Sequence, residues 1–249
     1  MVSRIIKLLF PEKCLICGGV TLEDIPLCAN CIDKFFGLFY EDCPACGQPR
    51  DDCACACGGG GFLFYFSSPA SKACIARVKR SLTKEAAAFM AELVCGSLSG
   101  RKSFDLVAYP PRSKKNVSKY GFDQAKEIAE HIAKNLGIKT TSAIKRRKGK
   151  TEQKLLSASQ RRKNALGLFY ADEKELGGVS SVLLFDDIYT TGATIKACEA
   201  SLRRAGVKQV KTFTLAYTPR KLKRRNKNKK AVPGAAKMTG RVFRYSPGG

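Results

Sequence analysis

Short apolar runs alternate with amphipathic segments over most of this chain, and this alternation predicts an α/β domain. The strand-like runs span residues 62–66, 104–109, 164–170, 182–185 and 209–218. The helical patterns, with apolar residues three and four positions apart, span residues 70–79, 85–98, 124–136 and 195–205. Because short, wholly apolar runs are typical of strands covered on both faces, we expect a mostly parallel sheet flanked by helices.

The most informative polar residues follow the apolar run at 182–185. Asp186 and Asp187 come first, and Thr190, Thr191, Gly192, Ala193 and Thr194 lead into the next helical pattern. Backbone N–H groups and hydroxyls in such a turn, next to a helix N-terminus, can bind a phosphate. Carboxylates at the carboxyl end of a strand suit sugar hydroxyls. The alternative interpretation is an ordinary helix cap made by Thr190 or Thr191, with solvated aspartates.

A second candidate loop follows the run at 104–109. It reads Pro110, Pro111, Arg112, Ser113, Lys114 and Lys115. Prolines stiffen the loop and cations fill it, so Arg112, Ser113 and Lys114 are candidates for binding a pyrophosphate. The basic run at 145–163 is a solvated surface in the simplest interpretation and a flap over an anionic substrate in the other.

The N-terminal quarter is rich in cysteine pairs with metal-binding spacing. Cys14 and Cys17 form one C-x-x-C pair and Cys28 and Cys31 another, as in two knuckles that close on one zinc ion. A second site can use Cys43 and Cys46 with two of three later cysteines, and the predicted choice is Cys53 and Cys57, although spacing alone does not exclude Cys55. A cross-braced arrangement of the pairs is the other possibility. Four-thiolate sites are closed, so structural zinc is expected. Free thiols or a redox pair are the alternative.

Charge and the absence of a secretion signal bear on partners and location. The net charge is +24, and residues 220–249 contain eleven Lys or Arg and no acid, which leaves +13 on the rest. Such a charge favours an anionic partner, and the basic tail is either a solvated arm or a segment that contacts nucleic acid. No stretch approaches the roughly 20 apolar residues of a membrane span, and no signal peptide is evident. A cytoplasmic protein with reduced cysteines is expected.

These features divide the chain into three parts. Residues 1–60 are expected to form a zinc-ribbon module with a short N-terminal amphipathic helix, and residues 61–218 the α/β domain. The glycines at 58–61 suit a boundary between the two. Residues 219–249 are expected to form a basic, disordered tail.

The order of these motifs resembles a known family. The aspartate pair with the run 190–194 is similar to the phosphoribosyl-pyrophosphate signature of type I phosphoribosyltransferases, and the P-loop and dinucleotide motifs do not match it. This signature, the cysteine pairs, the motif at 121–125 and the segment at 153–169 occur in one order along the chain. In that order they resemble the ComF family of competence-associated proteins. The resemblance covers residues 1 to about 218.

The resemblance carries functional expectations. It implies that Asp186 and Asp187 bind ribose hydroxyls, that residues 190–194 bind the 5′-phosphate, and that Mg²⁺ accompanies phosphoribosyl pyrophosphate. It also implies a link to DNA uptake. Whether the chain is an enzyme stays open, with phosphoribosyl transfer to an unknown acceptor favoured. The alternatives are a non-catalytic adaptor that binds single-stranded DNA and a competence protein partner, and a sensor that binds the sugar phosphate without turnover.

Overall fold

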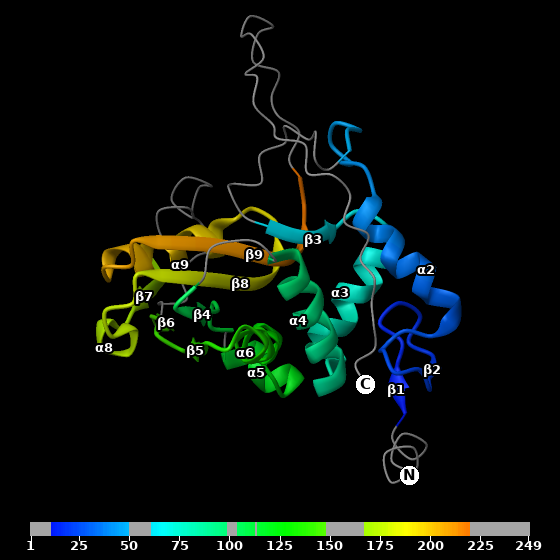
Figure 1. The fold of residues 1–249 in the computed structure, drawn as a ribbon, viewed down its shortest axis with the longest axis horizontal. Coiled ribbons are helices and arrows are strands. Elements are labelled where there is room, and N and C mark those ends of the chain that lie inside the picture. Colours follow the sequence, from blue (N-terminus) through cyan, green and yellow to red (C-terminus); the bar gives the residue numbers. More distant parts are fainter. Residues whose placement is uncertain (1–10, 50–60, 99–103, 113, 148–166, 220–249) are drawn as a thin grey trace, which may run out of the picture.

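A parallel sheet forms the centre of the molecule in this computed structural model, which describes residues 11–49, 61–98, 104–112, 114–147 and 167–219 (Figure 1). Among the described residues, five strands pair in the order β3-β9-β8-β4-β5, and all their pairings are parallel. Their bounds are β3 Gly61–Tyr65, β4 Leu106–Ala108, β5 Lys139–Thr141, β8 Ser181–Tyr189 and β9 Gln209–Tyr217. The predicted fold class is therefore confirmed.

Helices cover both faces of this sheet, as Figure 1 shows. The helices are α3 Pro69–Ser81, α4 Lys84–Leu98, α6 Gln124–Leu136 and α9 Ala193–Arg204. Alternate residues of β8 enter two cores: Leu183 and Phe185 pack in the core with α4 and α6, whereas Val182 and Leu184 pack in the core with α9. This period of two is why the apolar run at 182–185 is apolar at every position.

The strand order changes direction between β4 and β8, which are neighbours. After β4 the chain crosses to β5 at one edge, and after β8 it crosses to β9 on the other side. Open sheets of this kind bind ligands in the crevice outside the carboxyl ends of the strands at such a point. The two loops singled out in the sequence follow β4 and β8, so the topology brings them together.

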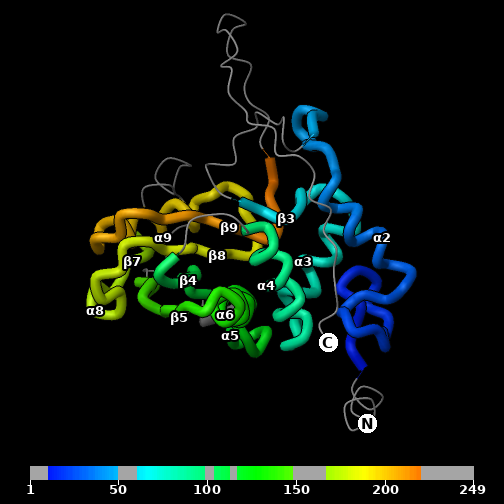
Figure 2. The backbone as a smooth tube through the Cα atoms, in the orientation of Figure 1, coloured from blue at the N-terminus to red at the C-terminus, as the bar shows by residue number. Residues whose placement is uncertain are grey.

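The cysteine-rich N-terminal segment packs against the helices beside the sheet (Figure 2). A hairpin of β1 Glu12–Lys13 and β2 Val20–Thr21 precedes α2 Ala29–Gly37 and the 3-10 turn η1 Leu38–Tyr40. The ring of Phe35 lies 6.3 Å from that of Phe64 in β3 and 5.6 Å from that of Phe89 in α4. Cys14, Cys31 and Phe35 thus belong to the same apolar core as the sheet.

Shorter elements complete the described chain. They are α5 Lys114–Tyr120, the antiparallel pair β6 Ile144–Arg146 and β7 Phe169–Ala171, and α8 Glu173–Leu176. Of the strand expected over 164–170, residues 164–166 lie outside the described residues and the last two positions belong to β7. The strand expected over 104–109 is shortened to three residues. The helix expected near the N-terminus, most of the basic run at 145–163 and the tail from 220 lie outside the described residues. In the parts of the chain that the structure describes, no helix has the length and apolarity needed to cross a bilayer.

Candidate functional site

A cleft of about 510 Å³ opens at the carboxyl ends of β4 and β8. Its walls come from α3, the loop after β4, the start of α6, the β6–β7 pair and the signature segment. Residues that line it include Lys72, Lys79, Arg80, Pro110, Arg112, Gln124, Arg146, Phe169, Asp186, Asp187 and Thr194. Most of the charged side chains on its wall are cations, which suits an anionic ligand.

The aspartate pair lies within a strand rather than after it. β8 continues to Tyr189 because its backbone pairs with β9, with Asp186 opposite Thr214 and Tyr189 opposite Tyr217. β4 ends earlier, at the pair Ala108 and Leu184, so the two carboxylates flank the crevice that it leaves. The expectation that the strand ends before the aspartates is therefore wrong. The two aspartates do line the cleft, as expected for carboxylates near the carboxyl end of a strand.

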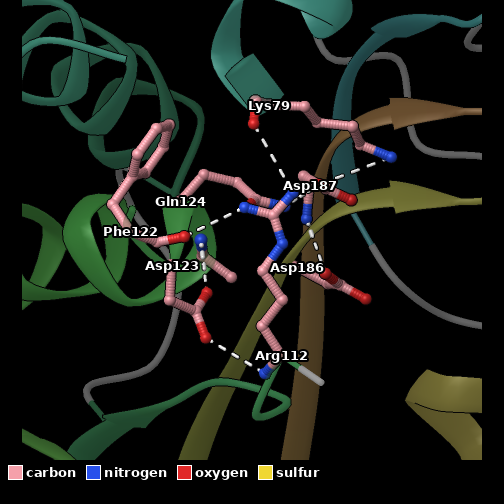
Figure 3. A network of polar contacts seen from close by, with 8 residues as sticks. Lys79, Arg112, Phe122, Asp123, Gln124, Asp186 and Asp187 are labelled. Carbon is pink, nitrogen blue, oxygen red and sulfur yellow. Dashed lines mark hydrogen bonds and ion pairs between the residues drawn. The ribbon is translucent and has the colours of Figure 1, made fainter. Parts of the chain in front are cut away.

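The two carboxylates have different surroundings. Asp187 is 6% exposed, accepts a hydrogen bond from Gln124 Nε2 and lies 3.6 Å from Lys79 Nζ (Figure 3). Asp186 is half-buried, and its Oδ1 accepts the backbone N–H of Asp187 at 2.8 Å. Desolvation and the neighbouring charge of Asp187 raise the pKa of Asp186 well above its usual range.

The signature turn connects β8 to α9 with an open surface. Thr190, Thr191 and Thr194 are exposed, and Gly192 takes a left-handed conformation (φ 70°) at the N-cap of α9. A Cβ at Gly192 would lie 2.1 Å from Tyr189 Oη, so both the backbone and the packing require glycine there. The N-cap residue Gly192 has no side chain to cap the helix, but the N–H of Ala193, the first residue of α9, donates to Thr191 Oγ1 at 3.3 Å. Within this turn, the lining of the cleft includes Thr194.

The loop after β4 is fixed by its arginine. Arg112 donates its backbone N–H to Asp123 Oδ2 at 3.0 Å, and its guanidinium donates to the carbonyl oxygen atoms of Phe122 at 3.0 Å and Lys79 at 3.5 Å. The guanidinium also lies 4.8 Å from the ring centre of Tyr120. Arg112 thus ties together the loop, α3 and the start of α6. Of the other candidates in this loop, Ser113 lies outside the described residues and Lys114 begins α5.

Two residues that sequence reasoning did not single out touch Asp187. Lys79 comes from α3 and Gln124 from the first position of α6, and Figure 3 shows both converging on the carboxylate. Asp123, the N-cap of α6, places Gln124 by accepting the backbone N–H of Ala125 at 3.1 Å. A signal existed for Gln124, because it belongs to the motif at 121–125, but its contact spans 63 positions of the sequence.

Comparison with known proteins identifies the fold family. Residues 119–245 match the phosphoribosyl transferase domain, which is half of the chain. The chain belongs to this family. Two relatives carry competence names. Competence protein ComFC of Streptococcus pneumoniae is 28% identical over 82% of this chain and 99% of the relative. Competence protein F of Haemophilus influenzae is 33% identical over 39% of this chain and 43% of the relative. These relatives confirm the resemblance to ComF proteins.

Solved structures in the same comparison are more distant. A glutamine phosphoribosylpyrophosphate amidotransferase from B. subtilis is 18% identical with a TM-score of 0.37, over 60% of this chain and 29% of that chain. An adenine phosphoribosyltransferase from Thermoanaerobacter pseudethanolicus is 18% identical with a TM-score of 0.35, over 53% of this chain and 80% of that chain. The chain therefore spans less than a third of the amidotransferase.

Beside this phosphoribosyl transferase domain, four cysteines gather at one point. The sulfur atoms of Cys14, Cys17, Cys28 and Cys31 all lie within 4.8 Å of one another, and those of Cys17 and Cys28 are 3.7 Å apart. Tetrahedral zinc with Zn–S bonds of ~2.3 Å requires sulfur atoms roughly 3.8 Å apart, so the residues fit the ion. Burial acts to raise the pKa of Cys14, but backbone N–H groups of Cys28, Cys17 and Ile16 lower it to about 6. This cluster can hold a metal such as zinc.

The second cysteine pair repeats the backbone of the first. Cys43 donates its N–H to Gln48 O at 2.8 Å and accepts the N–H of Gly47 at 2.7 Å, as Cys14 does with Gly19 and Gly18 at 2.8 and 2.9 Å. Cys43 and Cys46 therefore form a knuckle of the same kind. Cys53, Cys55 and Cys57 lie outside the described residues, so the second zinc site remains a prediction.

Proposed function

We propose that this protein binds phosphoribosyl pyrophosphate with Mg²⁺ in the cleft at the ends of β4 and β8. The observation that carries the proposal is that one cleft is lined by the aspartate pair, by Thr194 in the first turn of α9 and by a cationic wall. Membership of the phosphoribosyl transferase domain family supports the same ligand class.

Each part of the ligand has a matching group. The exposed turn at 190–194 suits the 5′-phosphate, because backbone N–H groups and the α9 dipole favour an anion there. Asp186 and Asp187 suit the ribose hydroxyls, and the loop with Arg112, Ser113 and Lys114 suits the pyrophosphate. Carboxylate oxygens are the ligands that Mg²⁺ prefers, so the aspartate pair also fits the ion, which when bound would neutralise charge on the pyrophosphate.

The reaction that this arrangement suits is transfer of the phosphoribosyl group. An acceptor forms a bond to the anomeric carbon as the bond to pyrophosphate breaks, and the pyrophosphate leaves with the electron pair. The protein's part is to orient the ribose, to place the carboxylate of Asp187 near the developing positive charge and to offset the charge of the leaving group with cations. The acceptor is unassigned, and the sensor alternative differs only in omitting this step.

Calorimetry with phosphoribosyl pyrophosphate and Mg²⁺ tests the proposal. We expect the wild type to bind and the double variant Asp186→Asn with Asp187→Asn to lose binding at least tenfold, since each carboxylate bonds a hydroxyl. Asp33→Asn, which changes an exposed aspartate of α2, is the matched control and should bind like the wild type. Equal binding by the double variant, or no binding by the wild type, would remove the proposal.

A second candidate function is an adaptor in DNA uptake. The competence names of the two relatives and the cations of α3 that line the cleft, Lys72, Lys79 and Arg80, favour it. In this function the zinc module would dock a competence protein partner while the basic surface holds single-stranded DNA. Binding of an oligonucleotide should then weaken steeply as salt rises, because phosphate neutralisation releases counterions. A flat salt response would exclude the adaptor.

A further inference from the structure

The side-chain amide of Gln124, at the wall of the cleft, has one polar atom with a hydrogen-bond partner and one without a partner among the residues that the structure describes. Gln124 is 6% exposed and lines the cleft beside Asp187. Its Nε2 donates to Asp187 Oδ2 (Figure 3). Its Oε1 is buried and accepts no hydrogen bond from the residues that the structure describes. A buried polar atom without a partner costs ~1–3 kcal/mol, so the free oxygen calls for an explanation.

The chemistry of Asp187 fixes which way the amide faces. A carboxylate only accepts hydrogen bonds, and Oδ2 of Asp187 also lies 3.6 Å from the cationic Nζ of Lys79. The nitrogen of Gln124 must therefore face Asp187, and the oxygen must face away from it. The reverse orientation would place two acceptors against each other.

The free oxygen selects a particular kind of ligand atom. A carbonyl oxygen accepts and cannot donate, so it bonds a hydroxyl or an N–H and does not bond a phosphate oxygen. The charged neighbours on the cleft wall, Lys79, Arg80 and Arg112, suit anionic groups instead. Gln124 is thus a neutral acceptor in a cationic cleft, next to the carboxylate proposed for the ribose.

We infer that Gln124 is a specificity-determining residue whose Oε1 accepts a hydrogen bond from a ribose hydroxyl of the bound sugar phosphate while its Nε2 holds Asp187 in place. This inference rests on the proposed function, because it places the ribose at Asp187. A vicinal diol donates two hydrogen bonds, and Asp187 Oδ2 is already engaged by Gln124 and Lys79. In this inference the amide oxygen is the acceptor for the second hydroxyl.

Titration of three sugar phosphates tests this inference. The ligands are ribose 5-phosphate, 2-deoxyribose 5-phosphate and 3-deoxyribose 5-phosphate, and the variant is Gln124→Met, which keeps the volume and removes both polar atoms. The wild type should bind ribose 5-phosphate about tenfold more tightly than one of the deoxy sugars. In Gln124→Met that preference should disappear, because the affinity for ribose 5-phosphate should fall further than the affinity for the same deoxy sugar.

Matched variants separate this role from a general effect on the fold. Gln209→Met changes a glutamine at the amino end of β9, outside the cleft, and should keep the wild-type preference. Gln124→Asn keeps a buried amide but withdraws it by one methylene, and should lose the preference even if Gln124→Met does not fold.

Two results would overturn the inference alone. One is a wild-type preference for the ribose that survives in both Gln124 variants, and the other is an equal loss for all three sugars, which would mean that Gln124 acts only through Asp187. A wild type that binds none of the sugar phosphates and no phosphoribosyl pyrophosphate would overturn the proposed function itself, and this inference with it.

Discussion

Asp186 is a proposed ribose ligand, but its ionised carboxylate destabilises the folded protein. Its half-buried carboxyl lies beside Asp187, and desolvation and that charge raise its pKa. The folded state therefore holds the Asp186 proton more tightly than the unfolded chain does. Ionisation then destabilises the fold, and this penalty develops as pH rises from about 4 through the raised pKa.

We expect Asp186→Asn to stabilise the protein at pH 8. The amide keeps an oxygen for the N–H of Asp187 and removes the like charge, so the free energy of unfolding should rise by about 1 kcal/mol after allowance for solvent screening. Melting curves of both proteins across pH check this. The difference in Tm should shrink towards zero near pH 4, and a variant less stable than the wild type at pH 8 would contradict the account.

The turn of the first cysteine pair, Cys14 and Cys17, contacts a helix that also lines the cleft. Gly18 has a left-handed backbone (φ 76°), and a Cβ there would lie 2.0 Å from Arg77 Nη2 of α3. The guanidinium of Arg77 thus lies against the first knuckle, while Lys72, Lys79 and Arg80 of the same helix line the cleft. One helix carries contacts with both sites.

A pair of glycine variants tests this contact. Gly18 and Gly47 occupy equivalent turns with φ of 76° and 69°, but a Cβ at Gly47 meets nothing within 4 Å. Gly47→Ala should cost only the backbone penalty of about 1 kcal/mol, whereas Gly18→Ala should cost more because Arg77 must move. Denaturant unfolding measures both. Equal losses would show that Arg77 does not pack on the knuckle.

The elements also show what the sequence could predict. Residues 62–66 and 70–79 were recognised because apolar spacing is a local signal. The structure adds that Ser68 caps α3 and that Pro69 begins it. The extension of β8 through Asp186 and Asp187 was not, because aspartate is rare in strands and the pairing partner, β9, lies 28 positions away. The short strands β6 and β7 form by pairing with each other, and the spacing of apolar residues within each of them does not predict a strand.

Only those parts of the candidate site that are contiguous in the sequence could be predicted. The signature turn and the cysteine pairs are contiguous, so their types and spacing are visible in the sequence. The roles of Lys79 and Gln124 depend on side chains that meet across the fold, at separations that no local pattern contains. Arg112 was predicted as a pyrophosphate ligand, and the structure adds its bracing contacts with Phe122 and Lys79.

At the scale of the whole molecule, the cysteine module and the sheet share one core. Cys14, Cys31 and Phe35 pack with residues of β3 and α4. The boundary predicted at residue 60 marks a change in sequence composition, whereas the apolar core extends across it. We propose that the described parts of the chain on the two sides of this boundary unfold together. The predicted tail from 219 onward stays a prediction, since all but its first residue lies outside the described residues.

Loss of a zinc ligand should therefore destabilise the entire protein. We expect Cys31→Ser to lower the zinc content and to reduce Tm in a single transition, because the free energy of metal binding is part of the free energy of folding. Cys95→Ser, outside the cluster, should keep the zinc content of the wild type. Metal analysis and calorimetric melting measure both effects. Two separate transitions in the wild type would contradict a shared core.

The central claim, that the cleft between β4 and β8 binds a phosphoribosyl group, is tested most directly by a crystal structure with phosphoribosyl pyrophosphate and Mg²⁺. The account predicts density for the 5′-phosphate on the turn at 190–194 and for the ribose beside Asp187 and Gln124. An empty cleft at saturating ligand, or a ribose bound away from the aspartates, would contradict it.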